Sequence, residues 1–347
     1  MNNLINSHSG FQPLKEVWIG GTYPENFYNN LSSEKQDIFG KITELTNNDL
    51  NALLKKLLEL GVVVRQPEFN CIEDYLDHED NLIKPPITPR DWALVLNDTL
   101  YIIPQYSSGV EPFESSIKNY LKNNQKVKIL NRQEESSDPL VWTTFPSVVR
   151  VGRDLYIDYP PNNNNAKLNN EIVISELSKD YRVHVTNSGF HSDGVFCPVA
   201  LEHIFSTHYK QIYNDTFPGW DVFFLTDTTG QRKNNGFNHN WWLPGHDYPQ
   251  ITSDKLLNFA ASWLGDSSET VFEVNMLVID EHNVICIAED DAACKKLESL
   301  GITPHIVDFK TRGFWDGGIH CITVDICREG HKIDYWPDRG SNGIYRY

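Results

Sequence analysis

Residue types that can carry chemistry gather in one stretch near the end of the chain, "GFWDGGIHCITVDICREG", from Gly313 to Gly330. Cys321 follows two glycines and His320, and it begins a run with the apolar pattern of a β-strand. A cysteine in this setting is either a buried core thiol or a nucleophile presented at the start of a strand. A nucleophilic thiol needs a nearby base to form its thiolate, so the rest of the chain must supply one.

Other polar residues stand directly before further predicted hairpins. Asp91 lies in "TPRDW", His191 and Asp193 lie in "GFHSDG", and Asn275 begins "NMLVIDEHNVICIA". If the hairpins are equivalent units of a ring, these residues converge near its axis with Cys321. His191 is then the candidate base. Two carboxylates without a metal cluster suit a planar guanidinium, which offers paired N–H donors.

This collection predicts attack of a thiolate on the central carbon of a guanidinium, giving a covalent thiouronium, with the same histidine protonating the departing amine. His191 and Asp193 also have the H-x-D spacing of some metal sites, but no third ligand is evident. We expect neither a metal nor a cofactor. We expect His320 to lie on the opposite strand face from the thiol and to pack there, and His246 and Asp247 to be polar groups of a loop.

One unit recurs along the chain: two strands joined by a tight polar turn, usually followed by an amphipathic helix and a third strand. Asn, Asp and Gly occupy the turns, where they tolerate positive φ. The predicted hairpins cover residues 93–103, 147–159, 193–207, 275–288 and 321–336.

A helix and a strand are predicted in most of the remaining segments, residues 48–69, 112–130, 170–185 and 291–309. In the first of these, Asn48 or Asp49 is expected to cap the helix and Gly61 to end it. The last hairpin has no helix after it, and the first helix has no full hairpin before it. If the two ends join, the chain holds five units in a closed ring and residues 1–347 form a single domain. An ordinary α/β sheet is the alternative.

Composition argues against several classes of partner. The 347 residues carry a net charge of −17, whereas nucleic acids and anionic membranes require basic patches. The six cysteines include no C-x-x-C pair, the first residues lack a secretory pattern, and no apolar run reaches about 18 residues. We therefore expect a cytoplasmic protein with reduced thiols. Residues 226–250 read as a long loop, which we interpret as an active-site lid.

The motifs resemble those of the amidinotransferases, the family that includes glycine amidinotransferase and the inosamine-phosphate amidinotransferases, and more distantly those of arginine and agmatine deiminases. They occur in the family's order between about residues 85 and 330, whereas the N-terminal third and residues 226–250 match poorly. They are PRD (89–91), RVGRD (150–154), DYRVH (180–184), HSDGVF (191–196), NMLVIDEHNVI (275–285), LGIT (300–303) and GGIHCITVDICREG (317–330).

The resemblance implies a five-bladed α/β-propeller of pseudo-repeated ββαβ units, the pentein fold, in agreement with the repeats. It implies that Cys321 is the nucleophile, that His191 is the acid and base, and that Asp91 and Asp193 bind the guanidinium. We also place Asn275 among the substrate-binding residues, because it begins an equivalent hairpin.

Two positions depart from the family's pattern. The family holds the donor's α-carboxylate with a basic residue after the histidine hairpin, and Lys210 is nearest by spacing, although it lacks the paired donors of arginine. The family's aspartate that orients the catalytic histidine corresponds to Thr144, with no acid anywhere in residues 141–149. Threonine cannot stabilise an imidazolium by charge. Either another acid substitutes, or a weaker base suffices, or the activity is altered or lost.

The sequence therefore predicts an enzyme that moves an amidino group from L-arginine or a related guanidine to an amine, in small-molecule or natural-product biosynthesis. A deiminase or dihydrolase on the same scaffold, or a guanidine-binding homologue with altered catalysis, are the alternatives. The expected partners are the guanidine donor and the amine acceptor, with neither nucleic acid nor membrane, and a homodimer is compatible with the pattern. The acceptor depends on loop residues that have no periodic meaning.

Overall fold

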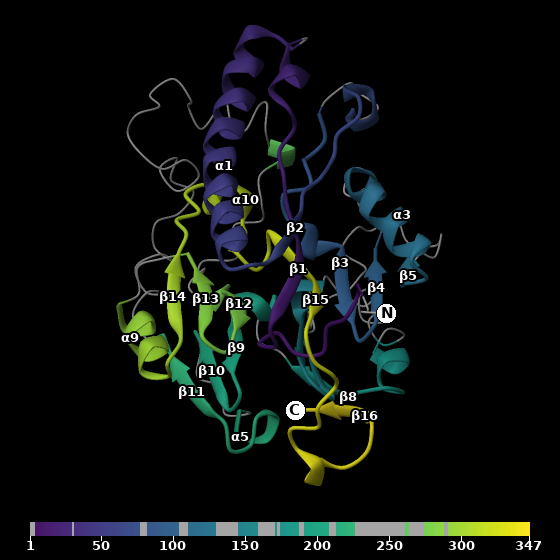
Figure 1. Ribbon diagram of the computed structural model, residues 1–347, viewed down its shortest axis with the longest axis vertical. Coiled ribbons are helices and arrows are strands. Elements are labelled where there is room, and N and C mark those ends of the chain that lie inside the picture. The colour runs from purple at the N-terminus through teal and green to yellow at the C-terminus, as the bar shows by residue number, and fades with distance from the viewer. Residues whose placement is uncertain are drawn as a thin grey trace.

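The protein is described here by a computed structural model, which covers residues 4–29, 31–76, 82–103, 110–129, 145–158, 171, 174–186, 191–207, 213–225, 261–263, 274–287 and 291–347. This part of the chain contains five small sheets, four with three strands and one with four (Figure 1). In each sheet an antiparallel pair is extended by a strand that runs parallel to its neighbour. The recurring ββαβ unit predicted from the sequence is confirmed.

Four of the sheets follow the chain in order. Their strands are β3 (Ala93–Leu96), β4 (Thr99–Ile102) and β5 (Lys126–Ile129); β6 (Val148–Val151), β7 (Asp154–Asp158) and β8 (Arg182–Thr186); β9 (Phe196–Ala200), β10 (His203–Ser206) and β11 (Asp221–Phe224); and β12 (Leu277–Asp280), β13 (Asn283–Cys286) and β14 (Thr303–Ile306). The connecting helices with described bounds are α3 (Glu114–Lys122), the short α5 (Tyr213–Thr216) and α9 (Asp291–Ser299).

The fifth sheet is built from both ends of the chain. Strand β1 (Leu14–Ile19) pairs antiparallel with β15 (Thr323–Arg328) and parallel with β2 (Val63–Arg65). Helix α1 (Ser33–Glu59) joins β1 to β2, and Figure 1 shows it lying beyond the end of that sheet. The prediction that the two ends share one unit is confirmed.

The predicted hairpin over residues 321–336 is wrong. β15 already has β1 as its antiparallel partner, so the chain does not turn back on itself. It crosses instead to the second sheet, where Asp334 pairs with Arg182 and with Arg153, the latter at 2.8 Å. Strand β16 (Gly343–Arg346) then adds to that sheet, parallel to β8.

Helix α1 has nearly the bounds predicted for the first helix, residues 34–60, but its cap is not the predicted one. Ser32 caps it, accepting a 3.4 Å hydrogen bond from the Lys35 amide, so the cap predicted at Asn48 or Asp49 is wrong. Asp49 is buried in the helix and accepts from the backbone N–H of Thr311 at 3.0 Å and from its hydroxyl at 3.1 Å. Gly61, with φ of +77°, follows the end of the helix as predicted.

A buried cluster of charges links three of the units. Asp325 in β15 binds Arg90 Nη2 through Oδ1 at 2.7 Å, and its Oδ2 binds Arg328 Nε at 2.7 Å and Arg150 Nη2. All four side chains are nearly or completely buried. Burial would raise the pKa of Asp325, but the three guanidinium groups hold it well below its usual value. The cluster fixes the segments that lead into the candidate site.

Among the helices that the structure describes, none combines the length and apolar character needed to cross a lipid bilayer. The single-domain organisation stays a prediction.

Candidate active site

Short 3₁₀ turns bring the polar residues of different units together. One such turn directly precedes the first strand of three units: η3 (Pro89–Asp91), η6 (Phe145–Ser147) and η7 (Ser192–Gly194). η6 contacts both η3 and η7, and the Ser192 hydroxyl donates a 3.0 Å hydrogen bond to the carbonyl of Ser147. Residues far apart in the sequence therefore share one end of the sheets, as the repeat predicted.

Asn275 holds the thiol of Cys321 in place. Its Nδ2 lies 3.1 Å from Cys321 Sγ, and its Oδ1 accepts from the backbone N–H of Cys321 at 3.1 Å and of His320 at 2.8 Å. Nδ2 also donates to the carbonyl of Asp193 at 3.3 Å. These contacts engage both ends of the amide within the protein, so Asn275 holds the segment that carries the thiol. Its predicted role in substrate binding stays a prediction.

Asp193 lies directly beside the thiol. Its Oδ2 is 3.6 Å from Cys321 Sγ and 2.7 Å from His320 Nδ1. Its other oxygen, Oδ1, is buried and has no hydrogen-bond partner among the residues that the structure describes. Burial would raise the pKa of Asp193, but the hydrogen bond from His320 and the charges of His191 and Arg90 lower it overall. The carboxylate is therefore kept ionised.

Asp91 and His191 belong to the same electrostatic neighbourhood. Burial raises the pKa of Asp91, as does the charge of Asp193, whereas His191, Lys84 and a 2.6 Å hydrogen bond from the Thr88 hydroxyl lower it. His191 is half-buried at the position that caps η7, two residues before Asp193. The charge of His191 thus acts on both carboxylates, as expected for residues that share a pocket.

Lys84 is a cation near the site that the sequence interpretation missed. It is half-buried, and two hydrogen bonds hold the segment before it. The Leu82 carbonyl accepts from the indole N–H of Trp263, and the Ile83 carbonyl accepts from the hydroxyl of Tyr23. Burial lowers its pKa, and the charges of Asp91 and Asp316 raise it. The signal available in the sequence was a lysine followed by two prolines, seven residues before Asp91.

The prediction for His320 is wrong. It assumed strand alternation from Cys321 onward, but β15 begins only at Thr323. Residues before it form turns, with the Ile322 amide bonded to the Gly318 carbonyl at 3.2 Å and the Thr323 amide to the His320 carbonyl at 3.1 Å. In a turn, side chains of consecutive residues need not point to opposite faces. His320 therefore reaches Asp193 instead of packing away from the thiol.

Several predicted residues lie outside the described part of the chain: Thr144, Lys210, and the loop 226–250 with His246 and Asp247. Within the described residues, no three His, Cys, Asp or Glu side chains form a group that could hold a metal ion.

Five ββαβ units with a buried thiol and carboxylates where they converge correspond to the pentein fold class. Two amidinotransferases are among the solved structures that share this fold. SxtG, an amidinotransferase from Microseira wollei in the saxitoxin biosynthetic pathway, has a TM-score of 0.68 at 18% identity, covering 96% of this chain and 100% of its own. The inosamine-phosphate amidinotransferase of Streptomyces griseus has a TM-score of 0.69 at 17% identity, covering 96% of this chain and 99% of its own.

Sequence comparison points to the same family. The L-arginine:L-lysine amidinotransferase of Pseudomonas savastanoi pv. phaseolicola is 22% identical over 250 residues, 67% of this chain and 59% of the relative. The mitochondrial glycine amidinotransferase of Gallus gallus is 26% identical over 188 residues, 54% of this chain and 39% of the relative. The matched regions thus span less than two thirds of these relatives. No family model matches the chain. The resemblance to the amidinotransferase family is confirmed in both sequence and fold.

Proposed function

We propose that the protein transfers an amidino group from L-arginine or a related guanidine to an amine acceptor, through a covalent thiouronium on Cys321. The observation that carries the proposal is Asp193 Oδ1, a buried carboxylate oxygen that no described residue satisfies, on a side chain 3.6 Å from a buried thiol. Buried polar atoms require a hydrogen-bond partner. A guanidinium N–H can supply it and would bring the guanidinium carbon close to the sulfur.

In the first half-reaction the thiol of Cys321 gives its proton to His191, and the thiolate attacks the central guanidinium carbon. The bond from that carbon to the departing nitrogen then breaks. The leaving amine, ornithine if the donor is arginine, takes the proton back from His191. The amidino group remains on sulfur as a thiouronium cation. Asp91 and Asp193 balance the positive charge of the guanidinium before and after the transfer.

In the second half-reaction an acceptor amine enters after the first product leaves. It gives a proton to His191 and attacks the thiouronium carbon, and the C–S bond breaks to restore the thiolate. Lys210 is proposed to bind the donor's carboxylate. Thr144 is proposed to occupy the orienting position of the missing acid. Asp91 and Asp193 both interact electrostatically with His191, so either carboxylate can stabilise the imidazolium in place of that acid.

The test is incubation of the protein with L-arginine, with and without a panel of primary amines, followed by mass spectrometry of the products and of the protein. We expect one amidino group on the peptide that contains Cys321, transfer to at least one amine, and neither outcome with Cys321→Ser. Citrulline or ornithine formed from arginine in large excess over the protein, without transfer to any amine, would make the protein a hydrolase. Amidino label on a different cysteine would overturn the mechanism.

A further inference from the structure

The contact between His320 and Asp193 joins two segments 127 residues apart at the reacting sulfur. His320 Nδ1 is 2.7 Å from Asp193 Oδ2, the same oxygen that lies 3.6 Å from Cys321 Sγ. An ionised carboxylate only accepts hydrogen bonds, so Nδ1 carries the hydrogen and donates it. Oδ2 is thereby committed to the protein, and Oδ1 is left for a ligand.

The backbone holds His320 in this position. Its N–H donates to Asn275 Oδ1 at 2.8 Å and lies 3.3 Å from the Asn275 carbonyl oxygen, while its own carbonyl accepts from the Thr323 amide at 3.1 Å. The backbone N–H and carbonyl of His320 are therefore both held by hydrogen bonds. A donor held this firmly loses little conformational entropy when it orients a carboxylate.

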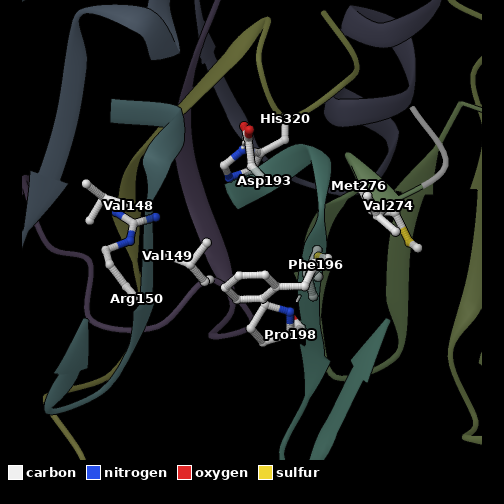
Figure 2. Close-up of a pocket in the computed structure, with 12 residues that line it drawn as sticks. Val148, Val149, Arg150, Asp193, Phe196, Pro198, Val274, Met276 and His320 are labelled. Atoms are coloured by element: carbon white, nitrogen blue, oxygen red, sulfur yellow. Dashed lines mark hydrogen bonds and ion pairs between the residues drawn. The ribbon is translucent and has the colours of Figure 1, made fainter. Parts of the chain in front are cut away.

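The side chains around Asp193 and His320 show which of them can orient the carboxylate of Asp193. Asp193 and His320 line one end of a pocket, and Figure 2 shows them side by side on one side of Val149 and Phe196. The other lining residues are mostly apolar: Val148, Pro198, Val274, Met276 and Val278. Arg150 also lines the pocket, but its Nη1 donates to the Val95 carbonyl and its Nη2 to Asp325.

The charge of the imidazole also suits this task. Burial and the neighbouring Arg90 lower the pKa of His320, although Asp193 and Asp325 raise it. A neutral imidazole orients a carboxylate without cancelling its negative charge, whereas a lysine or arginine would compete with a cationic substrate.

We propose that His320 is a positioning residue for the guanidine donor. It fixes Asp193 through Oδ2 so that Oδ1 faces a guanidinium N–H beside Cys321. This role rests on the proposed function. It predicts that His320 affects binding of the guanidine substrate, through the geometry and ionisation of Asp193. It also predicts that any neutral hydrogen-bond donor at the position of Nδ1 can replace His320.

A matched pair of variants tests the role. In asparagine the amide N–H₂ takes nearly the place of Nδ1, whereas in glutamine it takes nearly the place of Nε2. Both are neutral, polar and of similar size. Each is made in a Cys321→Ser background, which cannot react, and binding of L-arginine and of agmatine is measured by calorimetry. Thermal unfolding of each variant is recorded. His305→Gln serves as the control, because His305 lies on β14 and its Nε2 bonds Asn283 Oδ1 at 2.8 Å.

We expect His320→Asn to bind the guanidines nearly as the Cys321→Ser parent does, and His320→Gln to bind them about 10- to 100-fold more weakly, the value of one hydrogen bond to a charged group. The loss of binding on acidification should also move to higher pH in His320→Gln, because burial then acts on Asp193 with only the charges of His191 and Arg90 against it.

The outcomes separate this role from the proposed function. If the Cys321→Ser parent, the asparagine variant and the glutamine variant all bind the guanidines with equal affinity, the role of His320 is overturned. The proposed function then still stands. Equal weakening in both variants, without the shift in pH, would also overturn it, because it would indicate simple loss of packing. No binding of either guanidine by the folded parent would overturn the proposed function and this role with it.

Discussion

The backbone of Gly318 lies directly against the side chain of Asn275. A Cβ atom at Gly318 would be 2.5 Å from Asn275 Oδ1 and 2.6 Å from its Cβ, closer than real Cβ contacts allow. Its neighbour Gly317 is less restricted, because a Cβ there would meet Thr88 at 3.1 Å and Cys321 at 3.2 Å. The two glycines before the histidine and cysteine thus let Asn275 approach close enough to bond both backbone and thiol.

Gly318→Ala should therefore displace Asn275 and release Cys321. We expect a loss of arginine-dependent labelling of Cys321, with the fold retained, because the three atoms nearest the added Cβ all belong to the side chain of Asn275. The measurement is the rate of labelling by mass spectrometry, alongside circular dichroism. Gly40→Ala is the matched control: it lies in α1 with nothing within 4 Å of the added Cβ, and it should be neutral or stabilise by up to about 1 kcal/mol. Normal labelling in Gly318→Ala would refute this account of the glycines.

The two carboxylates should each contribute to binding of the guanidine donor. Asp91→Asn and Asp193→Asn remove a charged acceptor and place an N–H₂ group against a cation, so we expect kcat/KM for arginine to fall by about 10- to 100-fold in each. Steady-state kinetics with varied arginine would measure this. Asp308→Asn, at an exposed aspartate beside Arg312, is the control. Near-normal kcat/KM in both site variants would place the donor elsewhere.

The five repeated units could be predicted from the sequence because their signal is local and repeated. Tight turns such as Asn97-Asp98 mark each hairpin, and Asn97 has the positive φ of 54° that such a turn needs. The joining of the two ends followed from counting incomplete units. The path of residues 331–347 could not be predicted, because the bond of Asp334 to Arg182 and the pairing of β16 with β8 are tertiary contacts between segments far apart in the sequence.

The site was predictable in its residue types and less so in its contacts. Cys321, Asp193, Asp91 and His191 were predicted as site residues because each lies before a hairpin or in a family motif, and their roles stay predictions. His320 was misplaced because alternation was extended into a turn, and alternation holds only within a strand. The hydrogen bonds of Asn275 to Cys321 and His320 could not be predicted, because an amide can face either a substrate or the protein.

We expect Asp325 to contribute to the stability of the fold and not to take part in the reaction itself. Asp325→Asn leaves Arg90, Arg150 and Arg328 buried around a neutral group, so we expect a loss of about 3 to 5 kcal/mol in the free energy of unfolding. Urea denaturation monitored by tryptophan fluorescence would measure it. Asp98→Asn is the control, because Asp98 pairs with Lys126 at 2.7 Å on the surface and such pairs contribute at most about 1 kcal/mol. Equal effects of the two substitutions would contradict the importance assigned to the buried cluster.

Asp49 should make the protein less stable as the pH rises from about 4 to 6. Burial raises its pKa to about 6 although the hydrogen bonds from Thr311 oppose the shift, whereas in the unfolded chain an aspartate titrates near 4. Between these two values the unfolded state has lost the proton and the folded state retains it, so the free energy of unfolding falls with pH. At about 1.4 kcal/mol for each pH unit, the loss is about 2 to 3 kcal/mol, complete above pH 6.

Asp49→Asn cannot titrate and can still accept from Thr311 through its amide oxygen. Urea denaturation of both proteins at pH 4.5 and pH 7 should therefore show the variant gaining on the wild type as the pH rises. A constant difference between them across this range would mean that Asp49 is ionised in the folded protein at both pH values, and that its bonds to Thr311 outweigh its burial.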